Sequence, residues 1–267
     1  VFCTTGTNPL KCGLVGLLCG ARLRVGESFS FGRLLYNISI PYNRAAHEVP
    51  ANVAIAHAAA PGNEVPPCTV WTSPEDFEAA EACMGRLPSG TRLVGFHLGS
   101  GPNMAYKRWP AERFEKLGRT LLERYPVRIV IFGGPEEQMV AKSVAHGIGG
   151  AALNLSGKLD VRQAFEAMKR CEVFVTNDSG PMHLAAAAGC RVIALFGPTR
   201  ASKTGPWGQG HAVVSSESGC VGCYRYKPVR CATRECMERI SVHQVLRMFE
   251  ESAQVMRVSP NPGRAGI

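Results

Sequence analysis

The feature that most constrains the fold is a regular alternation of strand-like and helix-like segments through the second half of the chain. Short apolar runs rich in β-branched residues alternate with longer segments of helical periodicity. Strands that alternate with helices in this way build a parallel sheet covered by helices on both faces. The sequence therefore predicts an α/β fold with strands at 92–98, 127–132, 152–155, 173–176 and 192–196, and helices at 75–86, 110–124, 136–147, 161–170, 181–188 and 241–255.

The loops that follow the strands are the expected place for function. In open parallel sheets, ligands bind outside the carboxyl ends of the strands, near the point where the strand order reverses. Four loops are therefore the expected positions of ligand-binding and catalytic residues: 99–107, 133–137, 177–183 and 197–207.

The third of these loops carries the clearest pattern. Asn177-Asp178-Ser179-Gly180 follows a strand, and a helix is expected to begin near Pro181. The free N–H groups and the positive dipole end of such a helix form an anion site, which small residues leave open to a phosphate. Asp178 or Ser179 could instead simply cap the helix, and a histidine such as His183 is often a core residue.

Two other loops add polar groups. Ser100 lies in a Gly/Ser turn, and Lys107 and Arg108 precede a helix, which suits phosphate binding. The alternative is a solvated loop with two surface cations. Glu137, after the strand that ends in Gly133-Gly134, could accept hydrogen bonds from ribose hydroxyls. It could also be a first-turn acid that favours the helix dipole.

The combination of motifs resembles a known family. Lys107-Arg-Trp-Pro110, Gly133-Gly-Pro-Glu-Glu137, Asn177-Asp-Ser-Gly-Pro-Met-His183 and Leu195-Phe-Gly-Pro-Thr199 have the order and spacing of the ADP-heptose:lipopolysaccharide heptosyltransferases, glycosyltransferase family 9. The resemblance is clear from about residue 91 to 254 and faint over 1–60.

The resemblance implies a GT-B fold, in which two Rossmann-like domains face a cleft. Residues 1–70 would be a partial N-terminal acceptor-binding domain, 71–240 the nucleotide-sugar-binding domain, and 241–267 a C-terminal helix and frayed tail. The proline-rich stretch 61–74 is the expected linker. Family members begin with a strand and a loop that carries a catalytic Asp base. Because no such segment precedes Val1, we expect a truncated N-terminal domain and an inactive fragment.

The implied activity is inverting transfer of heptose from ADP-heptose to the inner core of lipopolysaccharide, with no cofactor required. Lys107 would stabilise the leaving diphosphate. Alternatives are a family member that uses another nucleotide sugar, and a nucleotide-binding fragment without catalysis. The resemblance assigns nucleotide-sugar binding to Ser100, Lys107, Glu137, Asp178, Ser179, Gly180 and His183.

A cysteine cluster lies outside these motifs, at Cys220, Cys223, Cys231 and Cys236. Two pairs separated by seven residues could hold a structural zinc ion, because four thiolates suit tetrahedral zinc. Reduced packing thiols and a disulfide are the alternatives. The absence of a secretion signal favours the reduced thiols of a cytoplasmic protein.

The net charge of +9 is concentrated in the two ends of the chain. Residues 1–60 carry +3, 61–199 carry +1, and 200–267 carry +5. Basic flanks suit an anionic partner, and the resemblance names one, a glycolipid acceptor at the cytoplasmic face of the inner membrane. We therefore expect a peripheral cytoplasmic protein. Nucleic acid is excluded as a partner, because aromatic residues are only 7% and do not interleave with basic ones.

Overall fold

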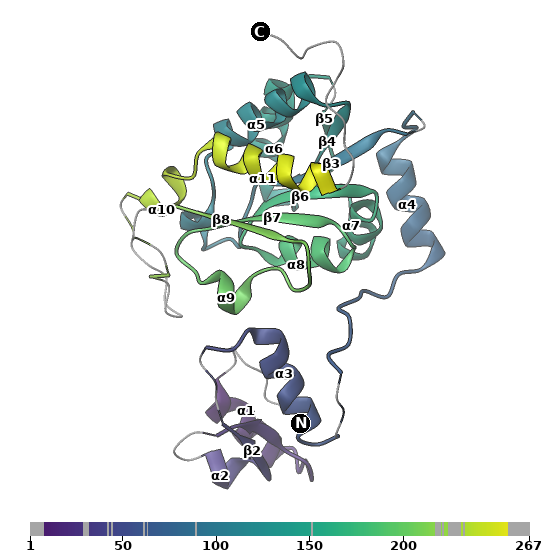
Figure 1. Ribbon diagram of the computed structural model, residues 1–267. Helices are drawn as coiled ribbons and strands as arrows, with labels where there is room; N and C mark the ends of the chain where they lie inside the picture. Colours follow the sequence, from purple (N-terminus) through teal and green to yellow (C-terminus); the bar gives the residue numbers. More distant parts are fainter. Residues whose placement is uncertain are drawn as a thin grey trace. The chain divides into compact units, whose positions relative to one another are not determined.

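The computed structural model describes residues 8–28, 32–41, 43, 45–60, 62, 64–88, 90–150, 152–216, 220, 222–223, 231 and 233–255 (Figure 1). The chain forms two compact units. The first comprises residues 1–67 with 202–204, and the second comprises 68–201 with 205–267.

The first unit contains a small parallel sheet, in which β1 (Val25–Glu27) pairs with β2 (Ile38–Ile40). Arg24 fixes the connection between the two strands, because its guanidinium donates to the carbonyls of Ala21 and Leu35 at 2.5 and 2.7 Å. The Asn8 side chain caps the first helix by accepting from the Lys11 N–H at 3.1 Å. The helices of the unit are α1 (Pro9–Leu18), α2 (Gly32–Leu35) and α3 (Glu48–His57).

The second unit is built on a six-stranded sheet in the order β5-β4-β3-β6-β7-β8, and every pair of neighbours is parallel. The order reverses between β3 and β6, which is the doubly wound arrangement of nucleotide-binding domains. The strands are β3 (Arg92–His97), β4 (Val127–Phe132), β5 (Ala152–Asn154), β6 (Cys171–Asn177), β7 (Arg191–Phe196) and β8 (Ala212–Ser215).

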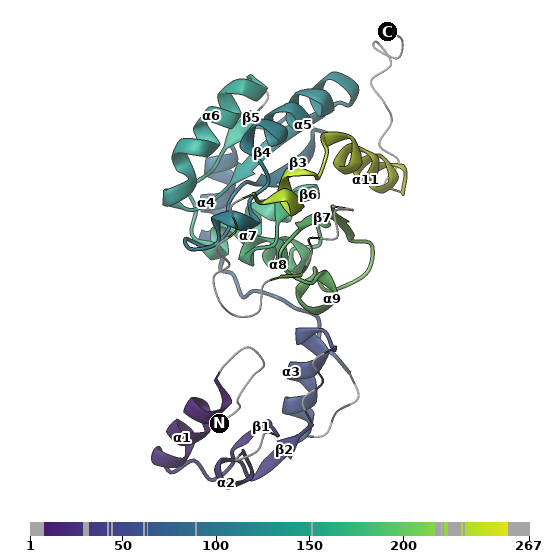
Figure 2. The same ribbon diagram turned by 90° about the vertical axis from the view of Figure 1, so that its left-hand side faces the viewer.

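Two layers of helices cover this sheet (Figures 1 and 2). One face packs under α5 (Ala111–Arg124), α6 (Gln138–Ile148) and α11 (Val242–Val255). The other packs under α4 (Pro74–Met84), α7 (Val161–Met168) and α8 (Gly180–Ala187). Short segments complete the unit: η1 (Ala105–Lys107), η2 (Pro135–Glu137) and the helix α10 (Glu235–Glu238). Most of the short helix α9 (Ala201–Thr204) belongs to the first unit, which contains residues 202–204.

The strand sequences explain the two cores, because alternate residues of a strand point to opposite faces. Val94 and Phe96 of β3 join the core under α5, whereas Leu93 joins the core under α4. Gly95 lies opposite Phe174, where an added Cβ would come within 2.3 Å of the ring. The glycine is therefore required by the aromatic side chain on the neighbouring strand.

The predicted α/β fold is confirmed, with differences at the ends of elements. The predicted helix 136–147 begins as the turn η2 and becomes α-helical only at Gln138. The predicted strand 173–176 is longer, from Cys171 to Asn177. Strand β8 was not predicted. It has four residues, of which only Val214 is buried, so its apolar signal is weak.

One buried side chain, that of Asn177 at the end of β6, joins the two strands at the reversal point. Its amide group donates to the carbonyls of Leu98 and Gly99 at 2.8 and 3.0 Å, and its oxygen accepts from the Trp109 N–H at 2.9 Å. Trp109 in turn donates from its ring to the Ile240 carbonyl at 2.8 Å. The loop after β3 is thus fixed to β6 and to the segment before α11.

We predict that Asn177→Ala lowers the free energy of unfolding by about 2–4 kcal/mol, because it leaves three buried backbone groups without their partner. Urea denaturation measures the change. Asn103→Ala, at an exposed position of the same loop, is the matched control and should change stability by less than about 0.5 kcal/mol. Equal effects of the two substitutions would contradict the structural role of Asn177.

Candidate functional site

The loops after β3, β4, β6 and β7 meet at the carboxyl edge of the sheet, on both sides of the reversal point. An ion pair links two of them. Lys107 donates from Nζ to Asp178 Oδ2 at 2.7 Å, and both side chains are largely buried, with 14% and 9% exposed. Thr199, after β7, donates its hydroxyl to the same carboxylate oxygen at 2.6 Å. Three of the four loops therefore converge on Asp178.

This geometry bears on the capping alternative for Asp178 and Ser179. Ser179 is the N-cap residue of α8, but its side chain makes no capping hydrogen bond. The Asp178 carboxylate accepts from Lys107 and Thr199 instead. Among the described residues, no side chain therefore caps α8. Pro181 has no N–H, and the Met182 N–H donates to the Ser179 carbonyl at 3.1 Å. The Gly180 N–H and the helix dipole are what the start of α8 can offer an anion.

Gly180 is the first residue of α8, and it is exposed. A Cβ at this position would meet no atom within 4 Å. Packing within the chain therefore does not require glycine here, and the space beside the helix start is open. His183 is one turn further along α8 and is exposed, so the interpretation as a core histidine is wrong.

Glu137 lies inside the carboxyl edge, with only 5% of its surface exposed. The Gly134 N–H donates to Oε2 at 2.9 Å, and His97 Nε2 lies 3.2 Å from the same oxygen. A Cβ at Gly99 would lie 1.1 Å from Oε1. The first glycine of the loop after β3 is therefore needed to make room for this carboxylate.

The pKa of Glu137 is lowered by its neighbours. Burial by itself raises it, but the hydrogen bond and the electrostatic interaction with His97 lower it, together with the Gly134 N–H and the charge of Arg108. The net shift is downward, so Glu137 is a carboxylate at neutral pH. Because a carboxylate only accepts hydrogen bonds, His97 Nε2 must carry the hydrogen that points to it.

His97 is a site residue that the sequence analysis missed. It ends β3, is 3% exposed, and lies 3.1 Å through Nδ1 from the Ser179 hydroxyl. It therefore connects Glu137, after β4, with Ser179, after β6. A single histidine at the end of an apolar strand gives no signal of such contacts, because its partners are 40 and 82 residues away.

Ser100 is buried and belongs to a local network with the loop that follows it. Its hydroxyl donates to the Met104 carbonyl at 2.7 Å and accepts from Arg108 Nε at 3.1 Å. Arg108 also donates to the Ser100 carbonyl at 3.3 Å. Ser100 thus holds Arg108 in place, and the alternative of two loosely solvated cations in this loop does not fit.

The four cysteines of the cluster are free thiols in the structure. Cys220 and Cys223 are exposed, Cys236 is buried, and the ten described cysteines are free thiols. Among the residues that the structure describes, no three His, Cys, Asp or Glu side chains are grouped so as to hold a metal ion. Burial, followed by the nearby Cys220, Cys223 and Cys231, raises the pKa of Cys236 to about 11. This thiol is protonated at neutral pH.

In the described part of the chain, no helix has both the length and the apolar character that crossing a bilayer requires.

Comparison with known proteins gives a family profile, curated relatives and solved structures that are similar to this chain. The profile of glycosyltransferase family 9 (heptosyltransferase) matches residues 6–231. Lipooligosaccharide heptosyltransferase 2 of Campylobacter jejuni is 30% identical over 165 residues, which are 60% of this chain and 50% of the relative. The chain thus spans about half the length of the curated relatives that it matches.

Two solved structures share the fold. Escherichia coli ADP-heptose LPS heptosyltransferase II superposes with a TM-score of 0.72 at 22% identity, over 93% of this chain and 75% of that one. A glycosyltransferase family 9 protein of Veillonella parvula superposes with a TM-score of 0.74 at 24% identity, over 91% and 70%. Because the family profile matches most of this chain, the chain belongs to glycosyltransferase family 9, the heptosyltransferases.

Proposed function

We propose that the carboxyl edge of the second unit binds a nucleotide sugar, ADP-heptose, and that the protein transfers heptose to the inner core of lipopolysaccharide. The observation that carries this proposal is the buried Lys107–Asp178 pair beside the uncapped start of α8. A cation and the positive dipole end of a helix at the reversal point of a parallel sheet suit a diphosphate. Heptose and lipopolysaccharide are favoured by the family and by the names of its members.

The proposed reaction is a direct displacement at the anomeric carbon, which inverts its configuration. The acceptor hydroxyl oxygen forms the new bond, the bond from the anomeric carbon to the diphosphate oxygen breaks, and ADP leaves with the electron pair. Lys107, the Gly180 N–H at the start of α8 and Arg108 would stabilise the charge that grows on the leaving diphosphate. No metal ion is needed in this scheme, because protein cations and dipoles supply the stabilisation.

The proton of the acceptor hydroxyl needs a base. Asp178 already accepts from Lys107 and Thr199, and Glu137 accepts from Gly134 and lies against His97. Neither carboxylate is assigned as that base. The family resemblance assigns the role to a catalytic Asp of the N-terminal acceptor domain, which would take the proton. We propose instead that Asp178 holds Lys107 in position, since a carboxylate would repel a diphosphate at close range. Glu137 remains the proposed ribose acceptor through Oε1.

The proposed partners and location follow from the same assignment. The acceptor is an anionic glycolipid, so the protein would work on the cytoplasmic face of the inner membrane without spanning it. The basic ends of the chain support contact with an anionic surface.

Isothermal titration with ADP, UDP and GDP tests the nucleotide assignment. We expect ADP to bind at least about tenfold more tightly than the other two, since a site that hydrogen-bonds one base leaves polar groups unpaired with another. Equal affinities would favour a different nucleotide sugar. Transfer of labelled heptose to lipopolysaccharide core then separates an active transferase from a fragment that only binds the donor.

We predict that Lys107→Met weakens ADP binding by about 10- to 100-fold, because it removes one charged hydrogen-bond donor to the diphosphate. Titration calorimetry measures the loss. Lys142→Met, on the exposed side of α6, is the matched control and should bind ADP like the wild type. Lys107→Arg keeps the charge and should recover part of the affinity. Unchanged binding in Lys107→Met would remove Lys107 from the site.

A second prediction concerns pH and His97. In the wild type, the lowered pKa of Glu137 contributes stability above the pKa of an unfolded carboxyl, and this is lost as pH falls through the folded pKa. In His97→Leu the effect of burial dominates, so the pKa of Glu137 rises above its value in the unfolded chain. The contribution of Glu137 to stability is then lost as pH rises, the opposite of the wild type. The stability difference between the two proteins should therefore grow as pH rises from about 3 to 6.

Urea denaturation across this pH range measures that difference, and a carbon-13 titration of Glu137 reports its pKa directly. His146→Leu, on α6, is the control and should leave the pKa of Glu137 unchanged. If His97→Leu shifts overall stability equally at every pH, His97 serves only to fill space.

A further inference from the structure

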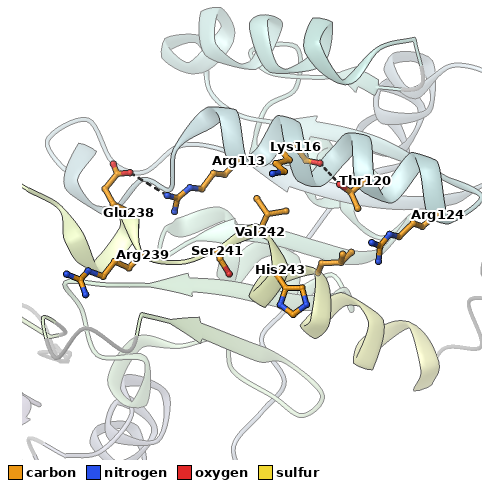
Figure 3. A pocket seen from close by; sticks show the side chains of 10 residues that line it. Arg113, Lys116, Thr120, Arg124, Glu238, Arg239, Ser241, Val242 and His243 are labelled. Carbon is orange, nitrogen blue, oxygen red and sulfur yellow. Dashed lines mark hydrogen bonds and ion pairs between the residues drawn. The ribbon is translucent and has the colours of Figure 1, made fainter. Parts of the chain in front are cut away.

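Hydrogen bonds and ion pairs within the protein determine which polar groups of the second unit remain available to a ligand. In the groove between α5 and the start of α11, such contacts engage the lining (Figure 3). Arg113 faces Glu238 at 4.0 Å, and the Thr120 hydroxyl donates to the Lys116 carbonyl at 2.9 Å. The start of α8 differs from this groove, because an internal contact there draws a side chain away from the helix end and leaves that end open.

Ser179 is the N-cap residue of α8, and its backbone is extended, with φ −159° and ψ 168°. A serine in this position and conformation normally accepts a hydrogen bond from the second or third N–H of the helix. The second residue is Pro181, which has no N–H, so the N–H that the Ser179 side chain could accept is that of Met182. This N–H donates to the Ser179 carbonyl at 3.1 Å, and the side chain makes no capping hydrogen bond. The backbone thus suits a capped helix, but the hydroxyl points elsewhere.

The Ser179 hydroxyl is held by His97. Its oxygen lies 3.1 Å from His97 Nδ1, and the histidine is only 3% exposed. Because His97 Nε2 donates to the Glu137 carboxylate at 3.2 Å, Nδ1 of the neutral ring is an acceptor and needs a hydrogen. A protonated ring would donate from Nδ1 to the same hydroxyl oxygen. Either form of the ring therefore draws the hydroxyl inward, away from the helix.

Thr176 carries the other hydroxyl near this ring, and the distances indicate which of the two pairs with it. The hydroxyl hydrogens of Thr176 and Ser179 face two acceptors, the Asn177 carbonyl and His97 Nδ1. Thr176 Oγ1 lies 2.9 Å from the carbonyl and 3.4 Å from Nδ1, whereas Ser179 Oγ lies 3.1 Å from each. The shortest pair of contacts joins Thr176 to the carbonyl and Ser179 to Nδ1. Both acceptors are then satisfied, as buried polar groups require.

Loss of the His97 ring would let the Ser179 hydroxyl turn toward the Met182 N–H. The backbone of Ser179 already has the N-cap conformation, so this turn needs only a change of side-chain rotamer. The hydroxyl oxygen would then lie at the start of α8, where its lone pairs would compete with an anion for the positive end of the helix. The contact between His97 and Ser179 therefore keeps the start of the helix open.

We propose that His97 is a positioning residue for the nucleotide sugar: by binding the Ser179 hydroxyl, it keeps α8 uncapped and leaves the start of the helix to the diphosphate. The Ser179 hydroxyl is then not itself a diphosphate ligand, which departs from the binding role that the family resemblance gives to this residue. The inference rests on the proposed function, because it concerns the same site. It goes further by assigning the open helix start to one ring and one hydroxyl.

Titration calorimetry of the full chain with ADP and with adenosine tests this role. Adenosine keeps the ribose that Glu137 is proposed to bind but lacks the diphosphate, so the ratio of the two dissociation constants measures what the diphosphate contributes. The ratio is needed because His97 also contacts Glu137, and a His97 variant can change ribose binding as well. A change in ribose binding alters both constants alike, whereas a change at the start of α8 alters only the constant for ADP.

We expect His97→Leu to lower the diphosphate contribution by about three- to tenfold, the effect of a competing N-cap hydrogen bond. Adding Ser179→Ala to this variant should restore the ratio to within about twofold of the wild type, because alanine cannot cap the helix. His97→Gln, whose amide keeps one donor and one acceptor, should lie closer to the wild type than His97→Leu. His146→Leu, at an exposed position of α6, is the matched control and should leave the ratio unchanged.

Two results would overturn the proposal. One is a double variant that keeps the full loss of His97→Leu, since a merely structural role of His97 gives no rescue. The other is a loss of more than about threefold in Ser179→Ala alone, which would make the hydroxyl a direct diphosphate ligand. This second test leaves His97 in place, so it decides the question even where His97→Leu folds poorly. ADP binding without the rescue rejects only this inference, whereas a wild type that binds ADP no more tightly than adenosine rejects the proposed function as well.

Discussion

The arrangement of the second unit depends on the buried amide of Asn177. Its three hydrogen bonds join the end of β6 to the end of β3 and to the start of α5. Two neighbouring parallel strands otherwise leave their carboxyl-end loops free to separate, since the ladder of hydrogen bonds stops where the strands end. Because Trp109 continues this connection to Ile240, the same network also anchors the segment that leads into α11. The loop that carries Lys107 lies inside this frame.

The two acidic side chains at the carboxyl edge are paired with cationic or hydrogen-bonding groups of the protein itself. Asp178 is opposed by Lys107, and Glu137 is held by His97 and the Gly134 N–H. Buried carboxylates without such partners would be protonated or would destabilise the fold. With both carboxylates engaged by groups of the protein, the positive dipole end of α8 is not cancelled by a side-chain cap. The two acids are therefore compatible with the proposed binding of an anion at this edge.

For this region, the sequence predicted the succession of strands, helices and loops well, and the contacts between side chains poorly. The alternation of strands and helices predicted a parallel sheet, and loop position alone placed Lys107, Glu137 and Asp178 at one edge. The ion pair between Lys107 and Asp178 spans 71 residues, and no local pattern reports such a pair. His97 was overlooked because it ends an apolar strand, where its polar partners come from other loops. The short strand β8 was overlooked because it buries one side chain.

Two glycines of the motifs, Gly99 and Gly180, occur for different structural reasons. Gly99 follows β3 in a Gly-Ser-Gly turn that suits phosphate, yet the structure requires glycine there because the Glu137 carboxylate fills the space. Gly180 has open space where its Cβ would be, so internal packing does not explain it. A requirement from within the protein therefore accounts for the first glycine but not for the second. Gly101 of the same turn is like Gly180 in this respect, because its Cβ would make only an ordinary contact with Met104 at 3.5 Å. Both loops thus leave room beside a glycine.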